Sequence, residues 1–141
     1  METIASALLA WLIAKTGLAA PDVPPIMLVP KHRLVEIAYG ANPPPLAAVS
    51  GLYDTKTSTI YLLDNWDGSQ LLDRSELVHE LVHHLQNVNK VPAPCFAAHE
   101  RQAIHLQLEW LREQGVKDPY EFLNINELYV LLVSGCRDSD R

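Results

Sequence analysis

The most regular apolar pattern in the chain lies between Asp73 and Asn89. Apolar residues recur there at intervals of three and four, and no Pro or Gly interrupts them, which predicts an amphipathic helix. Asp73 followed by Glu76 resembles a capping box and predicts the start of that helix. The apolar residues that share one arc of the helix are Leu77, Val78, Leu81, Val82, Leu85 and Val88.

The segments before this helix mix helical and strand patterns. Thr3–Thr16 predicts a packed first helix that ends at Gly17. The acidic charge near its start favours this helix over the alternative, an export signal. Ile26–Val29 is a short apolar run bounded by Pro, which predicts a buried strand. Leu34–Tyr39 fits either a second strand or a short helix.

Two apolar runs, Leu46–Tyr53 and Thr59–Leu63, flank a polar turn and predict a β-hairpin. After the central helix, Cys95–Glu113 predicts a second long helix, and Asn126–Ser134 predicts a last helix that is buried because it is so apolar. The pattern as a whole predicts an α+β fold with a small, mostly antiparallel sheet. Three or four helices are expected besides the one after Asp73.

Composition places the chain among ordinary globular proteins. Its 141 residues are 48% apolar and 20% charged, which predicts one domain over residues 1–141. The net charge is −6 and no basic cluster stands out, so nucleic acid is not an expected partner. The first apolar run is short and broken by Lys15, so no membrane span is expected. A cytoplasmic location follows, with a periplasmic or secreted one as the alternative.

The two cysteines, Cys95 and Cys136, leave two interpretations open. A disulfide would tie the C-terminal end to the segment before the second long helix and would indicate an oxidising compartment. Two free thiols in a reducing cytoplasm fit the sequence equally well.

The central helix also carries the candidate chemistry, in the pattern H-E-x-x-H from His79 to His83. Residues four apart lie on one face of a helix, so both imidazoles can reach one metal ion. Glu80 is turned about 100° from His79, too far to ligate easily but able to take a proton from an attacking water. This division of roles is typical of zinc hydrolases. His84 is turned away from His79, so we expect it at the surface or in a supporting role.

A catalytic zinc needs a third protein ligand, which the second long helix can supply through Glu100 or His99. Glu100 shares a helical face with apolar residues such as Ala103 and Ile104. A carboxylate buried there is costly unless it is paired or binds a metal, whereas a buried neutral His costs less. Packing therefore favours Glu100, and His99 remains the alternative.

His79-Glu80-x-x-His83 followed by Glu100-x-x-Ala103 resembles the gluzincin branch of the zincin metallopeptidases, and more narrowly the small ImmA/IrrE-like bacterial peptidases. The resemblance covers roughly residues 46–108. It implies a minimal zincin-like domain in which Zn²⁺ is held by His79, His83 and Glu100, with Glu80 as general base. It also implies that an edge strand lies over the metal-binding helix.

The sequence and the resemblance together predict a small zinc-dependent peptidase. Its peptide or protein substrate is expected to pair with Thr59–Leu63 as the edge strand. No motif identifies the group that stabilises the oxyanion, and the candidates are Tyr129, His105 and Tyr61. This gap supports an alternative function, a catalytically silent binding module that uses zinc structurally.

Overall fold

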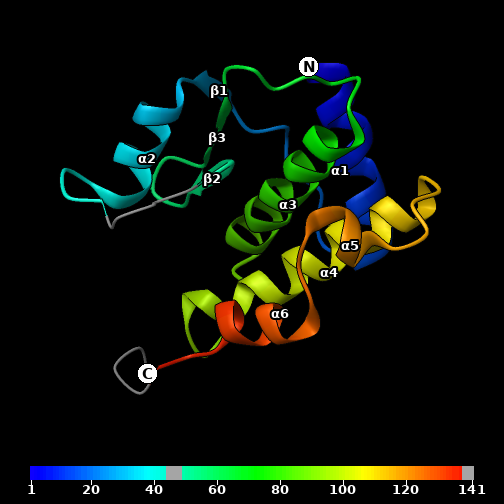
Figure 1. Cartoon of the computed structure of the whole chain (residues 1–141). Coiled ribbons are helices and arrows are strands. Elements are labelled where there is room, and N and C mark those ends of the chain that lie inside the picture. The colour runs from blue at the N-terminus through cyan, green and yellow to red at the C-terminus, as the bar shows by residue number, and fades with distance from the viewer. Residues whose placement is uncertain (44–48, 138–141) are drawn as a thin grey trace.

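The computed structural model describes residues 1–43 and 49–137, and these ranges form six α-helices, one 3₁₀ helix and three strands (Figure 1). The α+β class predicted from the sequence is confirmed. The elements in chain order are α1 (Glu2–Thr16), β1 (Ile26–Val29), α2 (Lys31–Tyr39), β2 (Gly51–Asp54), β3 (Thr59–Leu63), α3 (Leu71–Val88), η1 (Phe96–Ala98), α4 (His99–Glu113), α5 (Pro119–Leu123) and α6 (Glu127–Ser134).

The three strands form a mixed sheet in the order β1-β3-β2. β2 and β3 pair as the predicted antiparallel hairpin, with Gly51 opposite Leu62, whereas β1 runs parallel to β3, with Ile26 opposite Ile60. The prediction of a mostly antiparallel sheet was therefore wrong. Thr59–Leu63 is the central strand and not an edge strand, because the upstream strand β1 occupies its second side.

The outer strand that remains on the hairpin side is β2. Residues 46–48 of the run predicted as its strand lie outside the described residues, and the observed strand begins at Gly51. The segment that fitted either a strand or a helix is helix α2, whose Leu34 is buried.

α3 is the central helix of the main core and packs against α1, α4 and the hairpin strands. Its apolar arc is fully buried from Leu77 to Leu85, as the periodicity predicts. Each such side chain stabilises the fold by roughly 1.5–3 kcal/mol. The predicted capping box was wrong, because α3 already begins at Leu71. Asp73 instead accepts a hydrogen bond from the backbone N–H of Asp67, which holds the preceding loop on the first turn.

The second half of the chain packs on α4. One face of α4 joins the main core through Leu106 and Trp110, and another forms a small cluster with Val130 of α6. A disulfide joins Cys95, just before η1, to Cys136, just after α6. The prediction that α6 is buried was wrong: Leu132 is 71% exposed, because only one face of this short helix reaches α4.

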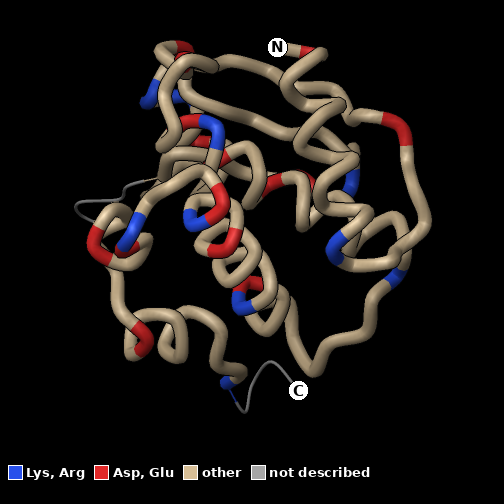
Figure 2. Tube along the Cα trace, turned by 90° about the vertical axis from the view of Figure 1, so that its right-hand side faces the viewer, with Lys and Arg blue, Asp and Glu red and all other residues tan. Residues whose placement is uncertain are grey.

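The first helix ends at Gly17, which adopts the left-handed conformation with φ 69°. None of the described helices is both long enough and apolar enough to cross a membrane. On the side of the molecule seen in Figure 2, basic residues lie scattered among acidic ones along the chain.

Candidate metal centre

His79 and His83 lie one turn apart on α3 and face the same side of the helix. Their ring centroids are 5.1 Å apart and the rings are inclined by 72°. The side chain of His83 is only 4% exposed. The spacing of the motif thus brings the two imidazoles together, as the sequence predicts.

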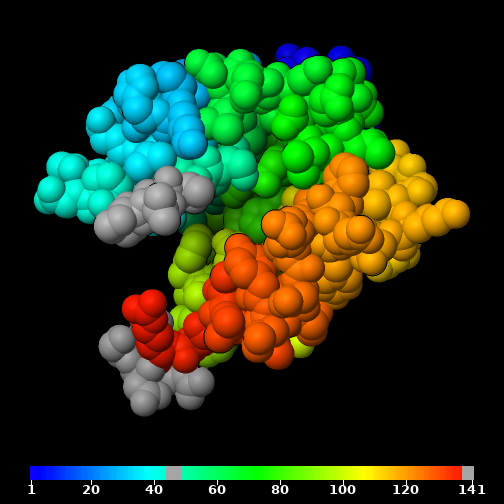
Figure 3. All heavy atoms as spheres, in the orientation of Figure 1, coloured from blue at the N-terminus to red at the C-terminus, as the bar shows by residue number. Residues whose placement is uncertain are grey.

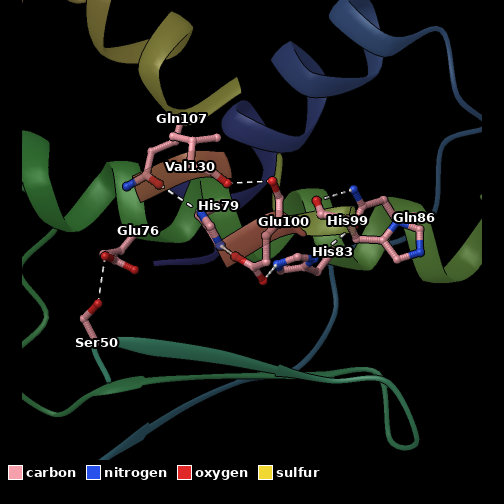
Figure 4. A network of polar contacts seen from close by, with 10 residues as sticks. Ser50, Glu76, His79, His83, Gln86, His99, Glu100, Gln107 and Val130 are labelled. Atoms are coloured by element: carbon pink, nitrogen blue, oxygen red, sulfur yellow. Dashed lines mark hydrogen bonds and ion pairs between the residues drawn. The ribbon is translucent and has the colours of Figure 1, made fainter. Parts of the chain in front are cut away.

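Glu100 of α4 reaches both imidazoles with a single carboxylate (Figure 4). One of its oxygens lies 3.0 Å from Nε2 of His79, and the other lies 2.8 Å from Nε2 of His83. Ligand atoms placed tetrahedrally around zinc, with bonds of about 2.0–2.2 Å, are roughly 3.3–3.6 Å apart. The two contacts of Glu100 are somewhat shorter than that spacing. The donor set of two imidazoles and one carboxylate is one that suits zinc.

His99, the alternative ligand, points elsewhere. Its imidazole lies edge-on to Phe96, with ring centroids 6.1 Å apart, and Phe96 in turn stacks on His83. Of the two candidates on this helix, Glu100 is the one placed between the imidazoles.

Glu80 is the second carboxylate at the centre. Potential ligand atoms of His79, Glu80 and His83 lie within 4.8 Å of one another, so distance alone also admits Glu80 as a ligand. We favour Glu100 because its oxygens are in direct contact with both ring nitrogens. Glu80 lies on the same helix as the two histidines, but its side chain leaves the helix in a different direction. It therefore lies beside the three proposed ligands.

The two carboxylates differ in their proton affinity. Burial raises the pKa of Glu80 to about 7, and the two histidines only partly oppose this effect. Burial also acts to raise the pKa of Glu100, but hydrogen bonds from His79 and His83 hold it well below its usual range. Glu100 is therefore a permanent anion, whereas Glu80 can gain and lose a proton near neutral pH.

The surroundings of His79 also favour a cation at this place. Burial alone would lower the pKa of His79, but Glu100, Glu80 and Glu76 together raise it to about 9. Three carboxylates thus attract positive charge to one imidazole. A metal ion would supply that charge in place of the second proton of His79.

The cleft above the centre has a volume of about 370 Å³. Its floor is α3 with part of α4, and one wall is the segment that leads into and along β2. The opposite wall comes from α5, α6 and the residues between them, and Figure 3 shows the hollow beside this wall. Ser50 at the start of the β2 wall donates a hydrogen bond of 2.7 Å to Glu76 of α3 (Figure 4). The side chains of Leu123, Ile125 and Tyr129 form the opposite wall.

Gly51 allows β2 to lie close to the candidate base. A Cβ atom at this position would lie 3.2 Å from Cγ of Glu80 and 3.4 Å from a carboxylate oxygen of Glu76. A side chain at this position would require the side chain of Glu80 to move by a few tenths of an ångström. Gly51 is thus a site residue that the sequence analysis did not identify.

The three candidates for oxyanion stabilisation lie in different places. Tyr129 borders the cleft. His105 is half-buried and its Nε2 lies 3.5 Å from a carboxylate oxygen of Glu127. Tyr61 lies on the central strand, opposite Leu52. Tyr129 is therefore the best placed of the three.

Two buried glutamines were also missed by the sequence analysis. The amide oxygen of Gln107 lies 3.0 Å from Nδ1 of His79, and that of Gln86 lies 2.9 Å from Nδ1 of His83. The sequence did contain a signal for them, because each glutamine lies within an apolar helical stretch and is therefore expected to be buried. A buried amide needs a hydrogen-bond partner.

Of the two expectations for His84, the surface position was wrong, because the residue is 5% exposed. Its Nε2 lies 3.3 Å from the carbonyl oxygen of Asp22, and its Nδ1 lies 2.8 Å from the hydroxyl of Tyr53 on β2. Because a carbonyl only accepts, Nε2 carries the proton and Nδ1 accepts from Tyr53. His84 thus attaches the β2 wall to α3.

Fold and site together define a small α+β protein in which α3 places His79, His83 and Glu80 under one cleft and α4 adds Glu100. The chain belongs to the family described as Domain of unknown function (DUF6647), whose model matches residues 1–141. Neither the comparison with curated proteins nor the comparison with solved structures finds a match.

Proposed function

We propose that this protein is a small zinc-dependent peptidase of the gluzincin type. The observation that carries the proposal is the placement of one carboxylate, Glu100, between Nε2 of His79 and Nε2 of His83. These three residues would hold the zinc ion, and the buried Glu80 stands beside them as a separate acid–base group.

When bound, zinc polarises a carbonyl group and lowers the pKa of water to about 7. Glu80 accepts the proton of the attacking water and later donates it to the leaving amine. In the metal-free protein burial raises the pKa of Glu80 to about 7. A bound cation would lower it, so the carboxylate would be deprotonated and able to accept a proton near neutral pH. Tyr129 is the proposed donor to the oxyanion.

The substrate is proposed to lie in the cleft as an extended peptide. Thr59–Leu63 no longer serves as the docking strand, because it has neighbours on both sides. β2 takes its place, since it is an outer strand among the described residues and lines the cleft. Backbone pairing along such a strand selects extended chains, and the apolar opposite wall contacts their side chains.

The test compares peptide cleavage by the zinc-loaded protein with cleavage by Glu80→Gln. A mixed peptide pool is incubated with each protein, with and without a chelator, and products are identified by mass spectrometry. The proposal expects chelator-sensitive products from the wild type alone, with zinc retained in both proteins. Full cleavage by Glu80→Gln would rule it out.

A catalytically silent module with structural zinc is the second candidate. It is favoured by the position of Tyr129, whose side chain is 46% exposed at the border of the cleft and is not held inside it. This candidate expects bound zinc and no chelator-sensitive product from any peptide in the pool.

The disulfide is evidence about the cellular compartment of the protein. Bonds such as Cys95–Cys136 persist in oxidising compartments and are rare in the cytoplasm. We therefore favour the periplasmic or secreted alternative over the cytoplasmic location expected from the sequence. Thiol titration of protein isolated from its native source, without reductant, should detect no free thiol.

A further inference from the structure

Gln86 and Gln107 are buried polar side chains for which the hydrolytic mechanism has no use. They are 4% and 5% exposed. Burying an amide is unfavourable unless its oxygen and nitrogen both find partners, so the partners show what each amide is arranged to do.

The hydrogen bonds of Gln107 have a definite direction. The hydroxyl of Ser75 donates to the carbonyl oxygen of Leu72 at 2.7 Å, so its oxygen is left to accept from Nε2 of Gln107 at 3.0 Å. The amide oxygen of Gln107 is then the atom that faces Nδ1 of His79, at 3.0 Å. Since an amide oxygen only accepts, Nδ1 of His79 must carry a proton.

The same reasoning applies to Gln86. Its Nε2 donates to the carbonyl oxygen of His99 at 3.1 Å and to Oε1 of Gln102 at 2.9 Å. Turning the amide over would bring its oxygen against both of these acceptors. Its oxygen therefore faces Nδ1 of His83 at 2.9 Å, and that nitrogen also carries a proton.

We propose that Gln107 and Gln86 are positioning residues that keep the proton of each histidine on Nδ1, so that Nε2 is the nitrogen presented to the metal. Both hydrogen-bond chains end on backbone carbonyls, those of Leu72 and His99, so neither amide can turn without losing a bond. Nε2 of each ring faces a carboxylate oxygen of Glu100, which also accepts, so in the metal-free protein Nε2 carries a proton as well, and this is the proton that a metal ion would displace. The inference rests on the metal centre of the proposed function and does not require peptide cleavage.

At this centre the groups that face Nδ1 of the two histidines are neutral amides, whereas in other metal sites a carboxylate can take this place. A carboxylate at Nδ1 makes the imidazole a stronger ligand and reduces the net positive charge at the metal. An amide fixes the same orientation without adding charge. Replacing the amide of Gln107 by a carboxylate should therefore preserve or strengthen metal binding, whereas an apolar side chain of similar size should weaken it.

The experiment measures zinc affinity by competition with a chromophoric chelator, on variants whose fold is checked by circular dichroism. Gln107→Leu and Gln86→Leu should each lose about 10–100-fold in affinity, the usual effect of removing such a partner. Gln107→Glu should bind zinc at least as tightly as the wild type. Gln114→Leu, at an exposed glutamine near the end of α4, is the matched control and should be unchanged.

Nuclear magnetic resonance of the zinc-loaded protein gives a second readout that does not depend on affinity. Long-range proton–nitrogen spectra should show a protected proton on Nδ1 of both His79 and His83. In Gln107→Leu the proton of His79 should lose its protection while that of His83 keeps it, and Gln86→Leu should show the reverse.

The outcomes separate this inference from the peptidase proposal. Unchanged zinc affinity in both folded leucine variants, a Gln107→Glu variant as weak as Gln107→Leu, or zinc bound through Nδ1 would each overturn the inference. None of these results would affect the evidence for cleavage. A protein that binds zinc as described but cleaves no peptide would overturn the peptidase and support the inference.

Discussion

Two regions border the cleft: the α3–α4 pair carries buried polar side chains, whereas α6 turns large apolar side chains to solvent. Within the α3–α4 pair, His83, Glu80 and Gln107 are at most 5% exposed, and each comes from a long helix of the core. In α6, Leu128 is 63% exposed and Val130 alone is buried. The proposed chemistry would thus lie on the two long helices of the core, and the proposed contacts with substrate side chains on a wall with few core contacts.

The largest effect should follow from Glu100→Ala, which removes the carboxylate from between the two imidazoles. Its loss in zinc affinity should exceed the roughly 10–100-fold expected for a supporting residue. His99→Ala is the matched control one position away and should keep its affinity within a few-fold. Chelator competition measures both, and equal losses in the two variants would undermine the assignment of the third ligand.

Glu80→Gln should come next, because it removes the acid–base group and leaves the ligands in place. Activity should fall by about 10²–10⁴-fold while zinc affinity stays within a few-fold. Since the base works in its deprotonated form, kcat/KM of the wild type should fall as the pH drops below about 7, the value to which burial raises the pKa of Glu80. A bound cation lowers that pKa, so the fall occurs at or below pH 7. A pH profile with no acidic limb in the wild type would contradict this role.

Removing the disulfide should affect the α6 side of the cleft and leave the metal centre intact. A double change, Cys95→Ser with Cys136→Ser, should lower the free energy of unfolding by about 2–4 kcal/mol. We expect KM to rise because the wall with Tyr129 loosens, and zinc affinity to remain within a few-fold. Denaturant titration and steady-state kinetics measure the two effects. Loss of zinc as large as that in Glu100→Ala would show that the two regions are not independent.

The smallest change should come from Tyr53→Phe, which releases the β2 wall from α3. The hydroxyl of Tyr53 lies 2.8 Å from Nδ1 of His84 and accepts from Nδ2 of Asn87 at 3.0 Å. Leaving these buried partners unpaired should cost about 1–3 kcal/mol of stability. Tyr39→Phe, at an exposed tyrosine, is the control and should be neutral in the same denaturant titration.

The stability that His84 contributes by holding β2 on α3 should also depend on pH. Burial lowers the pKa of His84, so the unfolded chain, in which the histidine titrates near 6.5, binds this proton more readily than the folded protein. The contribution of His84 to stability is therefore complete above pH 6.5 and declines as the pH falls below it. His84→Gln should lack this decline, and an equal acid dependence in both proteins would contradict the assignment.

The sequence predicted best the features that depend on residues close together along the chain. The spacing of His79 and His83 fixes their geometry within one helix, and packing arguments along one more helix favoured Glu100. Such local patterns survive in the fold because helical periodicity depends on near neighbours. The helix α1 and the β2–β3 hairpin were predicted for the same reason.

The errors concern contacts between distant segments. Strand order depends on β1, which lies far upstream of its partner β3, and no local pattern of Thr59–Leu63 distinguishes a central strand from an edge strand. The exposure of α6 depends on how much of α4 is left to cover it. Gln107 meets His79 only after α3 and α4 have packed, so its role could be seen only in the structure.

Zinc-edge X-ray absorption of the purified, zinc-loaded protein tests the metal centre most directly. The account predicts one zinc per chain bound by two imidazole nitrogens and by oxygen, at distances of about 2.0–2.2 Å. In Glu100→Ala the oxygen from the protein should be lost. Zinc bound by sulfur, or a spectrum with fewer than two imidazoles, would contradict the account.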